Sequence, residues 1–504
     1  MADRAASPLA GAGAADGNVL LVTLDQMRAD VLDGCLAGIV PLPAFDRLRR
    51  EGVHFANAFA ATVPCGPSRA SLLTGLHAFN HRSIRNGTPL ARHHATIATE
   101  ARRFGREPLL FGYCDATPDP DFSTYEQPAP GFREIVEMRF EAPLAWLAHL
   151  AARGYDLPRP LPDRLAELFR PVPAGGGAPA IDDPAIYAAA DSDTAFLADR
   201  TIEALDVRRD RPFFAHVTFI RPHPPLVAPA PYHRLAGREA IPDPAAAGFR
   251  HPFRDAWFSA PSQGGLFHGF DGDCAALSAG TVRTLRAVYL GLLAEVDHHL
   301  GRILDWLDRT NLADRTLVVV LSDHGEMLGD QGFWGKDSVL APAHRVPLLV
   351  RVPGGAAGRV VEAMTSTIDV APTILDWLGG VVPPAMDGAS LLPFLAGGTI
   401  GWRTAVLTEV DLSHPLRPTR FQRALGLDET RCNAAVLREA DRTLVHFNGG
   451  LPPLLFDRRS DPGERVDLAA DPASTGEVAR MRAAMLDLRM TRADRRLTGF
   501  AFGA

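Results

Sequence analysis

Two unbroken apolar runs, each ending in a carboxylate, most strongly constrain how this 504-residue chain can fold. They span residues 18–25 (NVLLVTLD) and 316–323 (TLVVVLSD). Such runs are typical of strands buried on both faces of a parallel sheet. Two further strand candidates lie at 212–220 and 347–352.

Helical patterns lie between these strands. Apolar residues recur at i, i+3 and i+4 in 194–205 and in 288–307, the spacing of an amphipathic helix. Strands that alternate with helices predict an α/β fold. We therefore expect a large, mostly parallel sheet sandwiched by helices, with a smaller C-terminal antiparallel sheet plus a helix.

The chain divides into a tail, a large unit and a small one. Residues 1–17 are rich in Ala and Gly and predict a mobile tail. Residues 18–380 would form the catalytic α/β domain, with loop excursions near 115–190 and 221–280 that wall the substrate pocket. Residues 381–504 would form an α+β subdomain. Its expected strands and closing helix lie at 405–410, 434–437, 443–447 and 474–488.

Composition narrows the class of protein. A net charge of -7 with scattered basic residues gives no footprint for nucleic acid. The start lacks the pattern of a secretory signal, and the first apolar run is too short to span a membrane. The cysteines are odd in number and far apart in sequence. We therefore expect a cytoplasmic protein without disulfides or a membrane partner.

Metal-capable side chains stand in pairs at the ends of two predicted strands. Asp25 and Gln26 follow the first run, and Asp323 and His324 follow the later one. Ligands in parallel α/β sheets bind beyond the carboxyl ends of the strands. The two pairs together predict a divalent metal site, although either pair alone would more often be structural.

The pentapeptide Cys-Gly-Pro-Ser-Arg at 65–69 is followed by ASLLTG. Pro67 suits the first turn of a helix, and a helix N-terminus attracts anions. On the simplest reading Cys65 is a buried thiol and Pro67 only starts a helix. The pentapeptide also resembles the sulfatase signature, in which a maturation enzyme oxidises the cysteine to formylglycine.

Further motifs extend this resemblance over residues 18–490. Asp25, the Cys65 motif, SDHGE at 322–326, Lys336 and the segment LFD…DPGE at 455–464 occur in order. Together they resemble the formylglycine sulfatases of the alkaline phosphatase superfamily. Gln26 and His324 replace the usual acidic and amide partners and resemble the phosphonate monoester hydrolase and phosphodiesterase branch. So do the segments 81–89, 110–115, 221–225, 335–338 and 493–499.

The resemblance implies a role for each candidate residue. Asp25, Gln26, Asp323, His324 and residue 65 would ligate one metal, with manganese favoured and zinc, iron or calcium as alternatives. The other implied roles are charge neutralisation near residue 65 (Arg69), protonation of the leaving oxygen (Lys336), general acid or base catalysis (His223) and donation to non-bridging oxygens (Asn86 and Tyr113). The chain departs from the branch at Cys114 and Asp115, where hydroxyl residues are usual.

The implied function is hydrolysis of phosphonate monoesters and phosphate diesters, with sulfate monoesters as secondary substrates. A dedicated arylsulfatase is the alternative, and a non-catalytic binding protein on the same fold is a remote one. Expected partners are small anionic esters and the maturation enzyme that makes formylglycine. The apolar and Arg-rich end, 485–502, predicts a segment that packs either on its own chain or on another subunit. The resemblance implies the second, an arm that joins subunits into a homotetramer.

Overall fold

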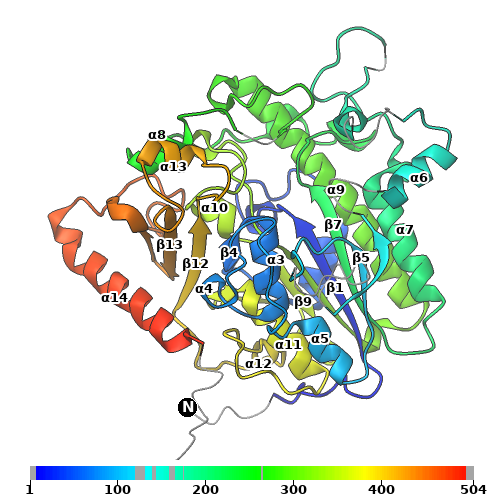
Figure 1. Ribbon diagram of the computed structural model, residues 1–504. Helices are drawn as coiled ribbons and strands as arrows, with labels where there is room; N and C mark the ends of the chain where they lie inside the picture. The colour runs from blue at the N-terminus through cyan, green and yellow to red at the C-terminus, as the bar shows by residue number, and fades with distance from the viewer. Residues whose placement is uncertain are drawn as a thin grey trace, which may run out of the picture.

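The structure is a computed structural model. It describes residues 7–119, 131–138, 144–157, 165–173, 175–262 and 265–494. An eight-stranded sheet forms its centre, and a five-stranded sheet lies beside it at the C-terminal end (Figure 1).

The central sheet has the strand order β10-β2-β9-β8-β1-β7-β5-β6. Strand β1 (Asn18–Asp25) lies between β7 (Phe214–Pro222) and β8 (Thr316–Ser322) and is parallel to both. All eight residues of β1 are buried, as its apolar sequence predicts. The remaining strands are β5 (Pro108–Gly112), β6 (Arg133–Glu137), β2 (Val53–Phe55), β9 (Leu348–Arg351) and β10 (Arg359–Val361).

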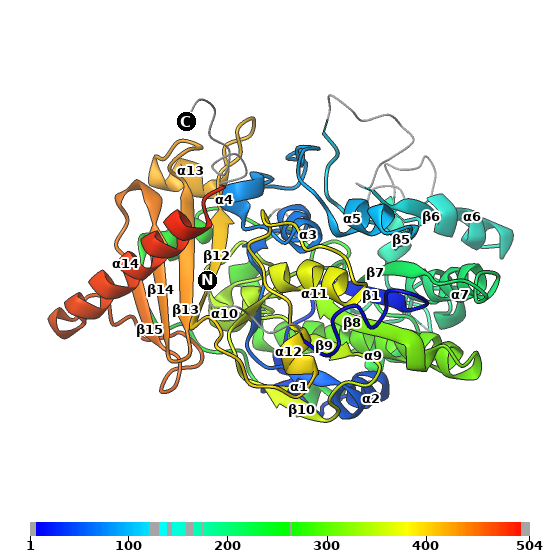
Figure 2. The same cartoon turned by 90° about the horizontal axis from the view of Figure 1, so that it is seen from below.

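Helices cover both faces of this sheet because side chains along β1 alternate between two cores. Leu20, Val22 and Leu24 pack with α9 (Ala279–Arg309), α7 (Asp193–Asp206) and α2 (Pro43–Glu51). Val19 and Leu21 pack on the opposite side. The helices there are α3 (Cys65–Thr74), α5 (Ile97–Arg103), α11 (Val370–Trp377) and α12 (Leu392–Leu395). Figure 2 shows the sheet between these layers. The predicted fold class is confirmed.

The second sheet has the order β15-β14-β13-β12-β4. Its strands are β12 (Ala405–Asp411), β13 (Asn433–Glu439), β14 (Arg442–Phe447), β15 (Leu454–Asp457) and β4 (Thr62–Val63). Strand β4 pairs in parallel with β12. Val478, Met481 and Met485 of α14 (Thr475–Arg492) pack onto one face of this sheet. Because β4 directly precedes Cys65, the second sheet also fixes the entry into α3.

Shorter elements join these layers. They are α1 (Asp30–Asp33), α4 (Ala78–His81), α6 (Leu144–Ala152), α8 (Pro252–Trp257), α10 (Ala341–His344), α13 (Arg420–Leu425), β3 (Ala58–Phe59) and β11 (Thr365–Ser366). Among the described residues, no helix is long and apolar enough to cross a membrane.

Three segments differ from the sequence-based picture. Residues 7–17 do not extend as a tail, since the N–H groups of Gly11 and Gly13 donate to Asp376 O and Trp377 O at 2.8 and 3.0 Å. Gly13 can approach the Trp377 ring this closely because it has no Cβ. A Cβ added at this position would fall 2.5 Å from the ring. The two excursions contain β6, α6 and α8 rather than loop alone. Residues 1–6 and the end of the predicted arm beyond 494 lie outside the described residues.

The core contains one carboxylic acid whose protonation should affect stability. Glu295 of α9 is 1% exposed, and no described residue offers a hydrogen-bond partner to its Oε1. Burial, with the nearby Asp193 carboxylate, raises the pKa of Glu295 to about 8. The folded protein therefore keeps this proton up to pH 8, whereas the unfolded chain releases it near pH ~4.3. Stability from this group should fall as pH rises between these values.

We predict that Glu295→Gln removes this pH dependence, because an amide mimics the protonated acid. The free energy of unfolding of the wild type, relative to the variant, should fall by up to about 1.4 kcal/mol per pH unit between pH 5 and 8. Denaturant titrations of both proteins at four pH values measure this difference. A difference that stays constant with pH would contradict the assignment.

Candidate active site

The site begins where β1 and β8 end side by side. The Asp323 N–H donates to Leu24 O at 3.2 Å, and Ser322 Oγ donates to the same carbonyl at 3.0 Å. Asp25 and Asp323 therefore emerge next to each other, 2% and 0% exposed. The order of residues along two parallel strands thus places two carboxylates at one edge of the sheet.

Gln26 turns sharply out of β1. Its φ of 76° lies in the left-handed region, which non-glycine residues seldom adopt outside functional turns. The turn aims its backbone N–H at Asp323 Oδ1, 3.1 Å away. The Gln26 carbonyl accepts a bond from Tyr289 OH of α9 at 2.9 Å. These bonds hold Gln26 over the two carboxylates.

His324 presents one defined nitrogen to the same point. Its Nδ1 lies 2.9 Å from Gly325 O, which favours a proton on Nδ1 and leaves the Nε2 lone pair available. Nε2 lies 3.1 Å from Cys65 Sγ and 3.8 Å from Asp25 Oδ1. The imidazole is therefore held in the tautomer that a metal ligand requires.

Helix α3 brings Cys65 to the strand ends. Cys65 is its first residue, is 4% exposed, and has Sγ 3.7 Å from Asp25 Oδ1. Burial, with the negative charge of Asp25, raises the pKa of the Cys65 thiol. The backbone at Gly66 lies close to the chain at Asp115, since a Cβ added to Gly66 would lie 2.9 Å from Asp115 O. The Gly66 N–H donates to Asn86 Oδ1 at 2.9 Å, so Asn86 holds the first turn of the helix.

Arg69 lies one helical turn after Cys65 and joins the two carboxylates. Its Nε donates to Asp323 Oδ2 at 3.0 Å, and Nη2 donates to Asp25 Oδ2 at 3.3 Å. Nη2 also donates to Tyr113 OH at 2.9 Å, and the Tyr113 hydroxyl in turn donates to Asp25. Arg69 is 1% exposed. Burial opposes the charge on Arg69, but the Asp323 and Asp25 carboxylates outweigh it and raise the pKa of Arg69 well above its usual range.

These residues fit a divalent cation. Ligand atoms of Asp25, Cys65, Asp323 and His324 all lie within 4.8 Å of one another. Two carboxylates around a single guanidinium leave negative charge, which a cation can balance. Oxygen donors combined with an imidazole suit first-row divalent metals.

Lys336 and His223 reach the site from two different loops. Lys336 Nζ donates to Gln26 Oε1 at 2.8 Å and lies 3.1 Å from His223 Nε2. Burial and the Lys336 charge lower the pKa of His223 to about 3. Burial also opposes the charge on Lys336, but its contact with Cys65 and the negative charges of Asp25 and Asp323 outweigh burial and raise the pKa of Lys336. The pair therefore consists of a cationic lysine and a neutral histidine, and the role of His223 as general acid or base stays a prediction.

Asn86 and Tyr113, which the sequence predicts to contact the substrate, bond to other residues of the protein. Asn86 Oδ1 accepts from Gly66, and the Tyr113 hydroxyl bonds to Asp25 and Arg69. Their contact with substrate oxygens stays a prediction. All ten candidate residues nevertheless lie in one connected group around Cys65. Glu326 and Ser68 also belong to it, since Glu326 bonds to Gln26 and Ser68 Oγ donates to Asp323 O at 2.5 Å.

Comparison with known proteins identifies the family of the chain. The sulfatase family model matches residues 17–381. The chain belongs to the sulfatase family. Membership implies a divalent metal and a formylglycine made from the signature cysteine, which here is Cys65.

Three similar proteins match over nearly the whole chain. The phosphonate monoester hydrolase SpPMH from Silicibacter pomeroyi is 45% identical with a TM-score of 0.90, over 95% of this chain and 96% of that one. The phosphonate monoester hydrolase of Agrobacterium radiobacter is 37% identical with a TM-score of 0.86, over 96% and 97%. The multifunctional alkaline phosphatase superfamily protein PehA from Trinickia caryophylli is 38% identical over 96% and 97%.

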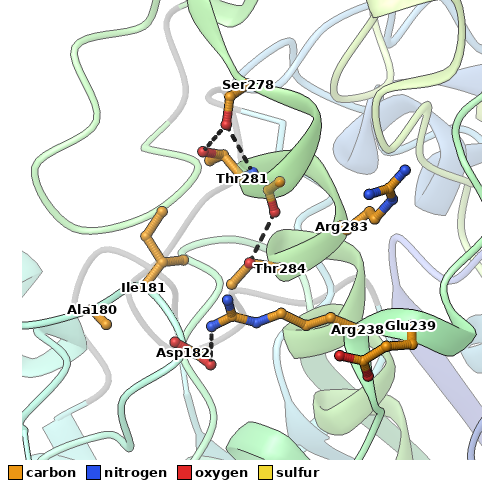
Figure 3. A pocket seen from close by; sticks show the side chains of 10 residues that line it. Ala180, Ile181, Asp182, Arg238, Glu239, Ser278, Thr281, Arg283 and Thr284 are labelled. Carbon is orange, nitrogen blue, oxygen red and sulfur yellow. Dashed lines mark hydrogen bonds and ion pairs between the residues drawn. The ribbon is translucent and has the colours of Figure 1, made fainter.

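A separate surface cavity of about 430 Å³ lies at the N-terminal end of α9 (Figure 3). Its arginines are paired with acids, Arg238 with Asp182 and Arg283 with Asp243. None of the sulfatase signature residues lines it. The chemistry of the chain is therefore assigned to the strand ends and not to this cavity.

We predict that Asp323→Ala abolishes metal binding and activity together, because Asp323 both contributes a ligand atom and pairs with Arg69. Asp337→Ala is the matched control, since Asp337 is an exposed acid beside Lys336. Elemental analysis of purified proteins should find metal in the wild type and the control but not in Asp323→Ala. Full metal content in a folded Asp323→Ala protein would refute the site.

Proposed function

We propose that this protein is a metal- and formylglycine-dependent hydrolase of phosphonate monoesters and phosphate diesters, with sulfate monoesters as secondary substrates. The observation that carries the proposal is the contact of Lys336 with both Gln26 and His223, beside Cys65 and His324. Similarity at 45% and 37% identity to two phosphonate monoester hydrolases supports the same substrate class.

One set of residues would act at the nucleophile and another at the leaving group. Residue 65, once oxidised to the aldehyde and hydrated by one water to a geminal diol, would supply a nucleophilic hydroxyl. A cation held by Asp25, Gln26, Asp323 and His324 would supply Lewis-acid charge. The N-terminus of α3 favours an anionic ester beside residue 65. Arg69 orients Asp25 and Asp323 by its ion pairs with both.

Lys336 and His223 act at the leaving oxygen. The Lys336 ammonium can offset charge as the ester bond breaks and can donate a proton to that oxygen. His223 Nε2 accepts a bond from Nζ, which orients the ammonium and provides a site for the proton during turnover. This arrangement needs only a single negative charge on the substrate, which phosphonate monoesters, phosphate diesters and sulfate monoesters share.

The proposal also covers the identity of the metal, the maturation enzyme and the oligomeric state. An imidazole and an amide in the ligand set favour manganese over calcium, with zinc or iron as further candidates. We propose a maturation enzyme that oxidises Cys65 and assembly into a homotetramer. The cysteines carry no disulfide, which suits the cytoplasmic location proposed from the sequence.

A dedicated arylsulfatase is the second candidate function. An arylsulfatase from Clostridium perfringens is 26% identical over 90% of each chain. Gln26 and His324 at the metal site favour the phosphonate branch over it. A non-catalytic binding protein would not need Cys65, both carboxylates, Lys336 and His223 in mutual contact, and all are present.

We predict formylglycine at residue 65 in active protein, because Cys65 opens a buried helix at the metal site. Peptide mass spectrometry should show loss of sulfur at this residue, and the intact protein should react with a hydrazide. Cys114→Ala is the control, since Cys114 is another buried cysteine near the site and its loss should leave hydrazide labelling intact. Fully active protein with an unmodified thiol at residue 65 would disprove the proposal.

We also predict that monoanionic esters outperform dianionic phosphate monoesters. The Arg69 charge is engaged by two carboxylates, which leaves Lys336 and the metal to balance the substrate. The kcat/KM for an aryl phosphonate monoester or phosphate diester should exceed that for the aryl phosphate monoester by roughly ten-fold or more, about 1.4 kcal/mol. Side-by-side kinetics on these three esters and an aryl sulfate give the ranking. A phosphate monoester as best substrate would overturn it, and a sulfate ester as best substrate would favour the arylsulfatase.

A further inference from the structure

Glu326 is a buried carboxylate that neither ligates the predicted metal nor touches a substrate position. It is 2% exposed and lies three residues after Asp323. Its Oε2 accepts a hydrogen bond from the side-chain amide nitrogen of Gln26. Its Oε1 accepts from two backbone N–H groups, those of Leu328 at 2.9 Å and Gly335 at 2.5 Å.

The bond to Glu326 decides which way the Gln26 amide points. Glu326 Oε1 already accepts from two backbone N–H groups, and the atom of Gln26 that faces Oε2 is the NH₂ nitrogen. The Gln26 oxygen then faces the opposite way, where Lys336 Nζ donates to it at 2.8 Å. Of the two amide atoms of Gln26, only the oxygen can accept from an ammonium or bind a metal, so this orientation suits both contacts.

The second oxygen of Glu326 fixes the loop that carries Lys336. Gly335 directly precedes Lys336, and its N–H donates to Oε1. One side chain therefore sets both the metal-facing oxygen of Gln26 and the position of the ammonium that contacts it. Partners of this kind behind metal ligands typically change metal affinity by about ten- to a hundred-fold when removed.

We propose that Glu326 is the positioning residue that makes Gln26 an oxygen ligand and aligns Lys336 with it. The inference rests on the metal site of the proposed function and assigns to Glu326 a role that neither the metal ligands nor the acid–base pair supply.

Glu326→Gln tests this role with almost no change of volume. The new amide can keep an oxygen toward the N–H groups of Leu328 and Gly335 only by turning its NH₂ toward Gln26. Gln26 must then flip its own amide and present NH₂ to Lys336 and the metal. In the other orientation, the new amide loses the bonds to the Lys336 loop. Either outcome should lower Mn²⁺ affinity by ten-fold or more.

The double variant Gln26→Glu/Glu326→Gln is the matched rescue, because it exchanges donor and acceptor and keeps the total charge. A carboxylate at position 26 accepts from the new amide and still offers an oxygen to the metal. Competition of Mn²⁺-loaded protein against a chelator of known affinity measures all three proteins. We expect a ten- to hundred-fold loss in the single variant and recovery to within a few-fold of wild type in the double variant.

Unchanged Mn²⁺ affinity in the single variant would overturn the inference. So would a loss of Mn²⁺ affinity that the double variant fails to restore. If the single variant does not fold, a folded double variant that does not bind Mn²⁺ would overturn it. Near-UV circular dichroism identifies unfolded proteins. A wild type that binds no Mn²⁺, zinc, iron or calcium would instead defeat the proposed function itself, so the two failures are distinguishable.

Discussion

The two ion pairs of Arg69 are the interaction on which the rest of the site depends. Asp25 and Asp323 are almost completely buried, and two such carboxylates would repel each other and lose hydration without a partner. Arg69 bonds to both. Since Cys65 lies four residues earlier on the same helix face, the charge that stabilises the carboxylates also brings the sulfatase cysteine to them. Removing one partner of a buried ion pair costs about 3–5 kcal/mol of folding free energy. The same contacts of Arg69 therefore contribute both to the stability of the fold and to the geometry of the site.

Two sheets cooperate to keep this helix in place. The central sheet supplies Asp25 and Asp323 from β1 and β8, and the second sheet captures β4 just before Cys65. Asn86 holds the first turn through Gly66, and Tyr113 links Asp25 to Arg69. Contacts from β1, β8, β12, Asn86 and Tyr113 thus fix residue 65 before any ligand binds. Such preorganisation is what catalysis by positioning and charge requires.

The fold and most of the site could be predicted because their signals are local. Buried central strands are continuous apolar runs, and Asp25 and Asp323 stand at their ends. Strand β9 was recognisable, but a four-residue apolar run does not reveal that it is antiparallel to β8. Strand β6 was missed because its edge position leaves only one of its five residues buried. The Tyr113–Asp25 bond and the Glu326–Gln26 bond were also missed, since they join residues 88 and 300 positions apart and no local pattern encodes them.

The central claim is that one metal and residue 65 share a single centre built on these strand ends. Diffraction from Mn²⁺-loaded crystals, with anomalous differences collected at the manganese edge, tests it most directly. The account predicts one anomalous peak within coordinating distance of Asp25, Gln26, Asp323 and His324, with density at residue 65 that lacks sulfur. A peak elsewhere, two peaks of equal height at the strand ends, or an intact Cys65 thiol in a fully active preparation would contradict it.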